Sequence, residues 1–120
     1  MKRDDDLVRE ILFRIEAEED HVSAAFSQSL DTSEQGRREF GHVRLLRDAG
    51  LLELSGKYGD MVRLTNKGHD FIAAVRDDNI WEKTKNVTSK AGVSTLGVLF
   101  DVALAFGKKK IAEIAGLDFQ

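Results

Sequence analysis

Apolar residues recur at helical spacing near the start of the chain, and this pattern predicts a helix over residues 4–19. The apolar stripe consists of Leu7, Val8, Ile11, Leu12 and Ile15. Three aspartates open the segment, where the positive end of the helix dipole favours acidic side chains. Residues 21–26 lack a clear period, so we expect a short extended stretch that leads into a loop over residues 27–32.

A second helix is expected to end at Gly50, the residue type preferred just after a helix. Asp31, Thr32 and Ser33 are candidates for its N-cap. Gly36 either lies within this helix or divides it into a very short first helix and a second helix over residues 37–49. The divided form predicts a helix-turn-helix.

The second helix has an apolar arc and a mostly basic arc when its residues are placed on a helical wheel. The apolar arc consists of His42, Val43, Leu45, Leu46 and Ala49. The opposite arc consists of Arg37, Gly41, Arg44 and Arg47, with Asp48 between them.

Residues 51–54 and 61–64 form two short apolar runs on either side of a segment with two glycines, which predicts a β-hairpin. A helix that leads directly into such a hairpin is typical of winged-helix domains. Thr65 is expected to cap a further helix that carries Phe71, and residues 77–79 either interrupt that helix or lie within it. The sequence therefore predicts a mainly α protein with a small β-hairpin, a winged helix-turn-helix.

The end of the chain differs in composition, because residues 91–106 carry a single charge, on Asp101. Three lysines follow at positions 108–110. A transmembrane helix needs about 20 apolar residues, and this run is shorter, so we expect no membrane span. We expect a winged-helix domain over residues 1–90 and a C-terminal helical tail over residues 91–120, packed either on that domain or on a second copy.

The chain has 120 residues and no cysteine, which excludes disulfides and thiolate zinc sites. Its first residues turn acidic at once, without the apolar stretch of a signal peptide, so a cytoplasmic location is expected. The net charge is −3, but the charge is unevenly distributed. Residues 1–20 hold four basic and eight acidic side chains, whereas residues 37–67 hold seven basic and four acidic ones.

Four blocks of sequence resemble a bacterial and phage-associated family, the domain of unknown function numbered 2513. They are Met1-Lys2-Arg3-Asp4-x-Asp6-Leu7-Val8-Arg9, His42-Val43-x-Leu45-Leu46-x-x-Ala49-Gly50-Leu51, Leu64-Thr65-x-x-Gly68-His69-x-Phe71 and Arg76-Asp77-x-x-Ile80-Trp81-x-Lys83. Asn66 stands where the family pattern has a tryptophan, and Gly41 stands where an aromatic residue often precedes the histidine. The resemblance covers about residues 1–90. It implies a winged-helix-like domain from prophage and mobile-element settings, and it implies no activity and no functional residues.

Two functions fit the basic segment. One is binding to double-stranded DNA as a transcriptional regulator, in which the second helix enters the major groove and the hairpin follows the phosphates. The candidate contact residues are Arg37, Arg38, Arg44, Arg47, Lys57, Arg63 and Lys67. Gly41 would let the helix backbone approach a groove closely. The alternative is a protein-binding adaptor, because a solvated helix face often carries arginines and many winged helices bind protein.

Other constellations give weaker signals. His21, His42 and His69 lie on three separate elements, so we expect structural hydrogen bonds to backbone carbonyls and no metal site. The acidic clusters fit solvated helix ends, and we expect neither an enzyme nor a cofactor. A homodimer is predicted through the only tryptophan and the apolar tail. The candidate interface residues are Trp81, Leu96, Phe100 and Leu104.

Overall fold

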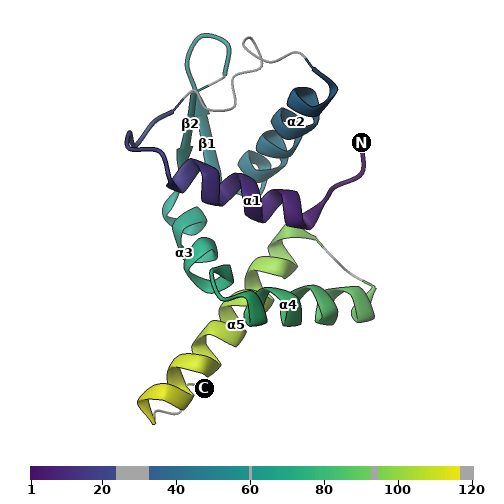
Figure 1. Ribbon diagram of the computed structural model, residues 1–120, viewed down its shortest axis with the longest axis vertical. Helices are drawn as coiled ribbons and strands as arrows, with labels where there is room; N and C mark the ends of the chain where they lie inside the picture. Colours follow the sequence, from purple (N-terminus) through teal and green to yellow (C-terminus); the bar gives the residue numbers. More distant parts are fainter. Residues whose placement is uncertain (24–32, 60, 93–94, 117–120) are drawn as a thin grey trace. The chain divides into compact units, whose positions relative to one another are not determined.

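The computed structural model describes residues 1–23, 33–59, 61–92 and 95–116. Within these ranges the chain is mainly helical with one antiparallel hairpin, as predicted, and it has five helices (Figure 1). The elements are α1 (Asp5–Glu16), α2 (Glu34–Asp48), β1 (Leu52–Ser55), β2 (Met61–Leu64), α3 (Asn66–Val75), α4 (Asp78–Ala91) and α5 (Leu96–Ala115). The chain divides into two compact units, residues 1–69 and residues 70–120. The boundary between domain and tail that the sequence predicts after residue 90 stays a prediction.

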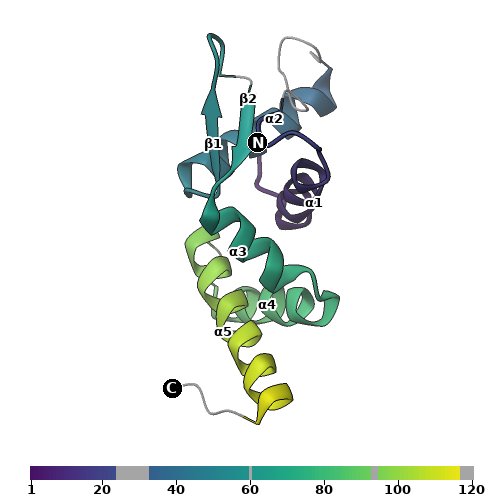
Figure 2. The same ribbon diagram turned by 90° about the vertical axis from the view of Figure 1, so that its left-hand side faces the viewer.

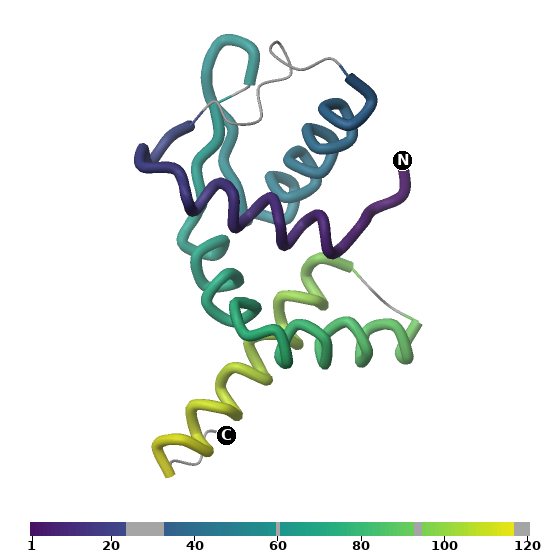
Figure 3. The backbone as a smooth tube through the Cα atoms, in the orientation of Figure 1, coloured from purple at the N-terminus to yellow at the C-terminus, as the bar shows by residue number. Residues whose placement is uncertain are grey.

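Helix α1 begins where the sequence predicts, because Asp4 caps it. The Asp4 carboxylate accepts hydrogen bonds from the backbone N–H groups of Asp6 at 3.0 Å and Leu7 at 3.2 Å. The five apolar residues of the predicted stripe are all buried. They form the core of the first unit, where α1 packs against both α2 and β2 (Figure 3). The helix ends at Glu16, earlier than the predicted residue 19.

Helix α2 is a single helix that runs through Gly36, so the interpretation in which Gly36 divides it is wrong. Ser33 caps the helix, and its hydroxyl accepts the N–H of Gly36 at 3.0 Å. Gly36 is buried and lies in the first turn, where the cap stabilises the backbone. Asp31 and Thr32, the other cap candidates, lie outside the described residues. The helix ends just before Gly50, as predicted, and the φ of this glycine, 81°, lies in the left-handed region.

The hairpin pairs Leu52 with Leu64 and Glu53 with Arg63 in antiparallel register. Ser23 adds an isolated bridge to Val62 on β2, through backbone hydrogen bonds of 2.9 and 2.7 Å. The sheet order is therefore Ser23, β2, β1, which confirms an extended conformation at Ser23. Of the rest of the predicted extended stretch, His21 and Val22 form a bend, and residues 24–26 lie outside the described residues.

The turn from β2 into α3 depends on Thr65 and Gly68. The Thr65 hydroxyl accepts the N–H of Gly68 at 3.0 Å, which confirms the predicted cap, and donates to the Gly50 carbonyl at 2.6 Å. A Cβ atom at position 68 would lie only 2.2 Å from the Leu51 carbonyl oxygen. Only glycine lets α3 start this close to the end of α2.

The second unit contains most of α3 and all of α4 and α5 (Figure 2). Residues 77–79 interrupt the predicted helix, because Asp77 caps α4 and separates it from α3. An aromatic cluster joins the three helices. The Phe71 ring meets Trp81 edge-on at 6.3 Å between centroids and stacks on Phe100 at 6.0 Å.

Helix α5 packs against α4, so the apolar tail is helical and has a partner within its own unit. It begins at Leu96, with Thr95 as cap, and continues through Gly107 and the three lysines to Ala115. In its last turns the apolar stripe is exposed, with Ile111 and Ile114 at 56% and 78%. None of the helices in the described part of the chain is long and apolar enough to cross a membrane.

Candidate nucleic-acid interface

The outer face of α2 carries the exposed arginines that the helical wheel predicts. Arg37, Arg44 and Arg47 are all exposed, whereas His42, Val43 and Leu46 are buried against the rest of the unit. The Arg44 guanidinium lies over the buried Phe40 ring, 5.1 Å from its centroid. This cation–π contact orients Arg44 without occupying its hydrogen-bond donors.

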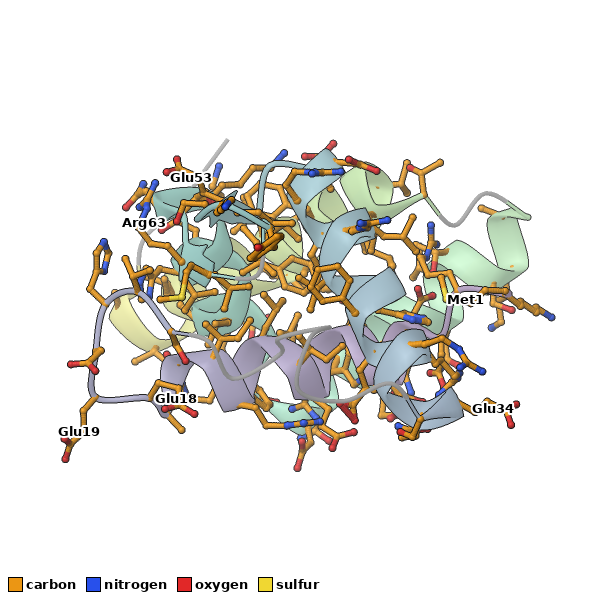
Figure 4. All side chains as sticks on the ribbon, turned by 90° about the horizontal axis from the view of Figure 1, so that it is seen from above. Met1, Glu18, Glu19, Glu34, Glu53 and Arg63 are labelled. Carbon is orange, nitrogen blue, oxygen red and sulfur yellow. The ribbon has the colours of Figure 1, made fainter. Side chains whose placement is uncertain are left out.

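Among the predicted DNA-binding residues, ion pairs with nearby carboxylates are described for Arg38, Arg47 and Arg63. Arg38 contacts Asp4 at 2.9 Å, Arg47 contacts Asp48 at 3.1 Å, and Arg63 contacts Glu53 at 2.8 Å across the hairpin. Figure 4 shows Glu53 and Arg63 side by side at the hairpin. In each pair the carboxylate side chain is at least 41% exposed, so the net contribution to stability is small, about 0 to 1 kcal/mol.

The two predicted lysines have different surroundings. Lys57 is exposed in the turn of the hairpin, with its Nζ 5.6 Å from the centre of the neighbouring Tyr58 ring, and Tyr58 is itself 74% exposed. Lys67 donates to the Ala49 carbonyl at 3.4 Å, where it stabilises the negative end of α2. The structure therefore places Lys57 in the turn of the hairpin and Lys67 just after its second strand.

His42 anchors α2 to the beginning of α1, and its side chain is fully buried. Its Nδ1 lies 2.8 Å from the Arg38 carbonyl oxygen, and its Nε2 accepts the backbone N–H of Asp4 at 2.9 Å. The carbonyl can only accept and the amide can only donate, so the ring is the neutral tautomer with its proton on Nδ1. The structural hydrogen bond predicted for this histidine is confirmed.

Asp4 is a residue of the site that the sequence interpretation did not single out beyond its place at a helix start. It caps α1, pairs with Arg38 and supplies the N–H that His42 accepts. The Arg38 guanidinium and the N–H of Leu7 hold the pKa of the Asp4 carboxyl below its ordinary value. Sequence spacing alone cannot show that an N-cap aspartate forms an ion pair with an arginine on another helix.

An ion pair between Arg14 and Glu39 links α1 to α2. Arg14 donates two parallel hydrogen bonds to the Glu39 carboxylate, both 3.1 Å long. This carboxylate raises the pKa of Arg14, since it favours the charged guanidinium. Glu39 faces α1 and therefore does not add negative charge to the outer face that carries Arg37 and Arg44.

Gly41 lies on the outer face of α2, between Arg37 and Arg44 in sequence, and Met1 lies against it. A Cβ atom at position 41 would be 2.8 Å from the Met1 Sδ and 3.1 Å from its Cε. Figure 4 shows Met1 beside α2, on the side away from the hairpin. The glycine therefore admits a close approach by Met1 of the same chain, and the approach of a DNA groove at this position stays a prediction.

The four predicted dimer-interface residues all lie in the second unit. Trp81 and Leu96 are buried within the single chain, at 2% and 7% exposure, while Phe100 and Leu104 are half-buried. Trp81 thus contributes to the core through its contact with Phe71. The dimer stays a prediction.

The two remaining histidines and several acidic residues near the end of α1 line a hollow of about 230 Å³ in the first unit. His21 and His69 lie there with the acidic residues Glu16, Glu18, Glu19 and Asp20, and Figure 4 shows Glu18 and Glu19 at the end of α1. Within the described ranges, no three histidine, aspartate or glutamate side chains are placed to hold a metal ion.

Comparisons with known proteins give a family and no function. No curated protein and no solved structure matches the chain. A family model described as a hypothetical protein, DUF2513, matches residues 2–94. These residues include all of the first unit except Met1, with the outer face of α2, and the match confirms the resemblance drawn from the four sequence blocks. Because it covers well over half of the 120 residues, the chain belongs to the DUF2513 family, a domain of unknown function.

Proposed function

We propose that the first unit is a winged-helix domain that binds double-stranded DNA, with the outer face of α2 in the major groove and the hairpin turn along the phosphates. The observation that carries this proposal is the pair Arg37 and Arg44, exposed on either side of Gly41 on a helix that leads directly into the hairpin. The sheet order Ser23, β2, β1 supports the winged-helix topology, because a third strand position beside the hairpin extends its sheet.

The spacing of the two arginines suits a duplex. They are seven residues apart, which is two helical turns, or about 10 Å along α2. The major groove is about 12 Å wide and admits one helix, so both guanidinium groups can reach base edges or flanking phosphates. Lys57 would then meet the backbone at the tip of the hairpin.

The ion pairs at Arg38, Arg47 and Arg63 are compatible with this function. Exposed pairs contribute little to stability, and a phosphate is at least as good a partner for a guanidinium as a carboxylate. These arginines can therefore exchange Asp4, Asp48 and Glu53 for phosphate oxygens. We expect the exchange to make binding weak at physiological salt and strong only at low salt.

Fluorescence anisotropy with a labelled random-sequence duplex tests the proposal. We expect binding at about 50 mM salt that weakens steeply as salt rises. Replacing Arg37 and Arg44 together with alanine should weaken binding about tenfold or more. The matched control replaces Lys83 and Lys90, which are exposed on α4, and removes the same charge. Absent binding at low salt, or equal losses in both double variants, contradicts the proposal.

A protein-binding adaptor is the second candidate, favoured by the same three ion pairs. They leave less net positive charge on the outer face of α2 and the hairpin, and Tyr58 adds an exposed aromatic ring. A photo-crosslinking residue in place of Arg44 distinguishes the two in cells. A discrete protein adduct, together with absent DNA binding in vitro, selects the adaptor.

The finer assignment, a phage or mobile-element transcriptional regulator acting as a dimer, rests on this DNA-binding function. Half-exposed Phe100 and Leu104 on α5, followed by exposed Ile111 and Ile114, offer apolar surface for a second copy. Light scattering measures this directly. A mass of a single 13.4 kDa chain at micromolar concentration contradicts the dimer and leaves DNA binding by a monomer open to the anisotropy test.

A further inference from the structure

We propose that the segment Met1–Arg3 is a further DNA-contacting element, held across the outer face of α2 so that Lys2 adds a phosphate contact. The proposal rests on the proposed DNA-binding function and names residues that lie outside the predicted set of seven. It follows from where the segment is fixed at its two ends.

One end of the segment is fixed by Asp4. The Asp4 backbone N–H donates to His42 and its carboxylate pairs with Arg38, so two side chains of α2 hold this residue. Arg3 is turned toward α1, because its Nε donates to the Asp5 carboxylate at 2.9 Å. The segment before Asp4 therefore begins at a residue that two side chains of α2 contact.

The other end is fixed by Met1 at Gly41. The Met1 Sδ occupies the space where any other residue at position 41 would place its Cβ atom. Consecutive Cα atoms are about 3.8 Å apart, so Lys2 lies within one residue of this contact. The Lys2 side chain is exposed, and the contact beside it lies on the arc of α2 that carries Arg37 and Arg44.

The contact at Gly41 is adjustable, because Met1 is 72% exposed and its thioether is flexible. A duplex that approaches α2 can shift the Met1 side chain without unfolding either helix. Lys2 is then carried to the edge of the groove, where an ammonium on a long flexible stem can follow a phosphate. The segment works with the arginines of α2 and does not block them.

A double-mutant cycle with Lys2→Ala and Gly41→Ala tests the proposal by DNA anisotropy. The methyl group that Gly41→Ala adds displaces Met1, and alanine favours the helix, so this variant should fold; circular dichroism verifies it. We expect Lys2→Ala alone to weaken binding about fivefold and to lower the salt slope by about one. In the Gly41→Ala background, Lys2→Ala should have a much smaller effect, because the segment is no longer held.

Methionine methyl NMR gives a readout that does not depend on DNA binding. The chain has two methionines, Met1 and Met61, so the ¹³Cε spectrum has two resonances. Gly41→Ala should move the Met1 resonance and leave that of Met61 unchanged.

The outcomes distinguish a failure of the DNA-binding function from a failure of this inference. Absent DNA binding by the wild-type protein overturns the DNA-binding function and this inference with it. DNA binding that is unaffected by Lys2→Ala, or a Lys2→Ala effect of equal size in both backgrounds, overturns the inference alone. A Met1 resonance that does not respond to Gly41→Ala overturns the contact on which it depends.

Discussion

The buried His42 side chain accepts a hydrogen bond from the backbone N–H of Asp4, at 2.9 Å. The same ring donates from Nδ1 to the Arg38 carbonyl, 2.8 Å away. One neutral imidazole therefore links Asp4, the N-cap residue of α1, to the middle of α2. The candidate interface depends on this link, since it holds both the orientation of α2 and the course of the residues before Asp4.

Replacing His42 with phenylalanine should destabilise the first unit by about 1 to 3 kcal/mol. The ring volume is largely retained, but the Asp4 N–H and the Arg38 carbonyl lose their partner. Urea unfolding measures the loss, and His69→Phe at an exposed position is the control, with a change within about 0.5 kcal/mol. A ¹⁵N spectrum that places the His42 proton on Nε2 contradicts the assigned tautomer.

Asp4 should give the first unit part of its acid sensitivity. Its pKa is lowered in the folded state, chiefly by Arg38, so the folded protein binds this proton more weakly than the unfolded chain. The contribution is complete above the unfolded-chain pKa of about 3.9 and is lost as pH falls through the lower folded value. Asp4→Asn, which can still cap the helix, should lose less stability than wild type on acidification from about pH 5. Parallel acid limbs for the two proteins contradict this.

Gly68→Ala should destabilise the protein by about 1 to 3 kcal/mol, because its methyl group meets the rigid Leu51 carbonyl at 2.2 Å. Gly97→Ala is the matched control within α5. Position 97 is exposed and its nearest atom, the Thr95 hydroxyl, is 4.0 Å away, so alanine there should stabilise the helix by up to about 1 kcal/mol. Thermal unfolding compares the two. Equal effects of the same sign argue against the close approach of α3 to Leu51.

Phe71→Leu should weaken the second unit, since leucine keeps most of the apolar volume but loses the ring contacts to Trp81 and Phe100. We expect a cost of at least about 1 kcal/mol. Near-ultraviolet circular dichroism reports directly on Trp81, the only tryptophan. Its signal should change in this variant and remain unchanged in Phe13→Leu, a substitution in α1.

Local patterns were sufficient to predict most elements of the fold. The apolar stripe from Leu7 to Ile15, the glycine after α2 and the Thr65 cap each depend on residues close in sequence, and each is confirmed. Gly36 shows the limit of such patterns. Because glycine has a low helix propensity, the sequence allowed a break in the helix at Gly36. The Ser33 cap stabilises that turn, and the free energy of its hydrogen bond outweighs the low propensity of one residue.

The candidate site was harder to predict because its geometry depends on contacts between distant residues. The wheel placed Arg37 and Arg44 on the exposed face of α2 correctly. It could not show that Asp4 and Glu53 pair with Arg38 and Arg63, which lie 34 and 10 residues away. The contact between Met1 and Gly41 spans the whole of α1, and no periodicity indicates it.

Chemical-shift mapping of the amide resonances with a short random-sequence duplex tests the central claim most directly. We expect the largest shifts on Arg37, Gly41 and Arg44 of α2, on Lys57 in the hairpin turn and on Lys2, and we expect them to diminish as salt is added. Shifts confined to other elements, or no shifts at low salt, would contradict the claim that the outer face of α2 binds DNA.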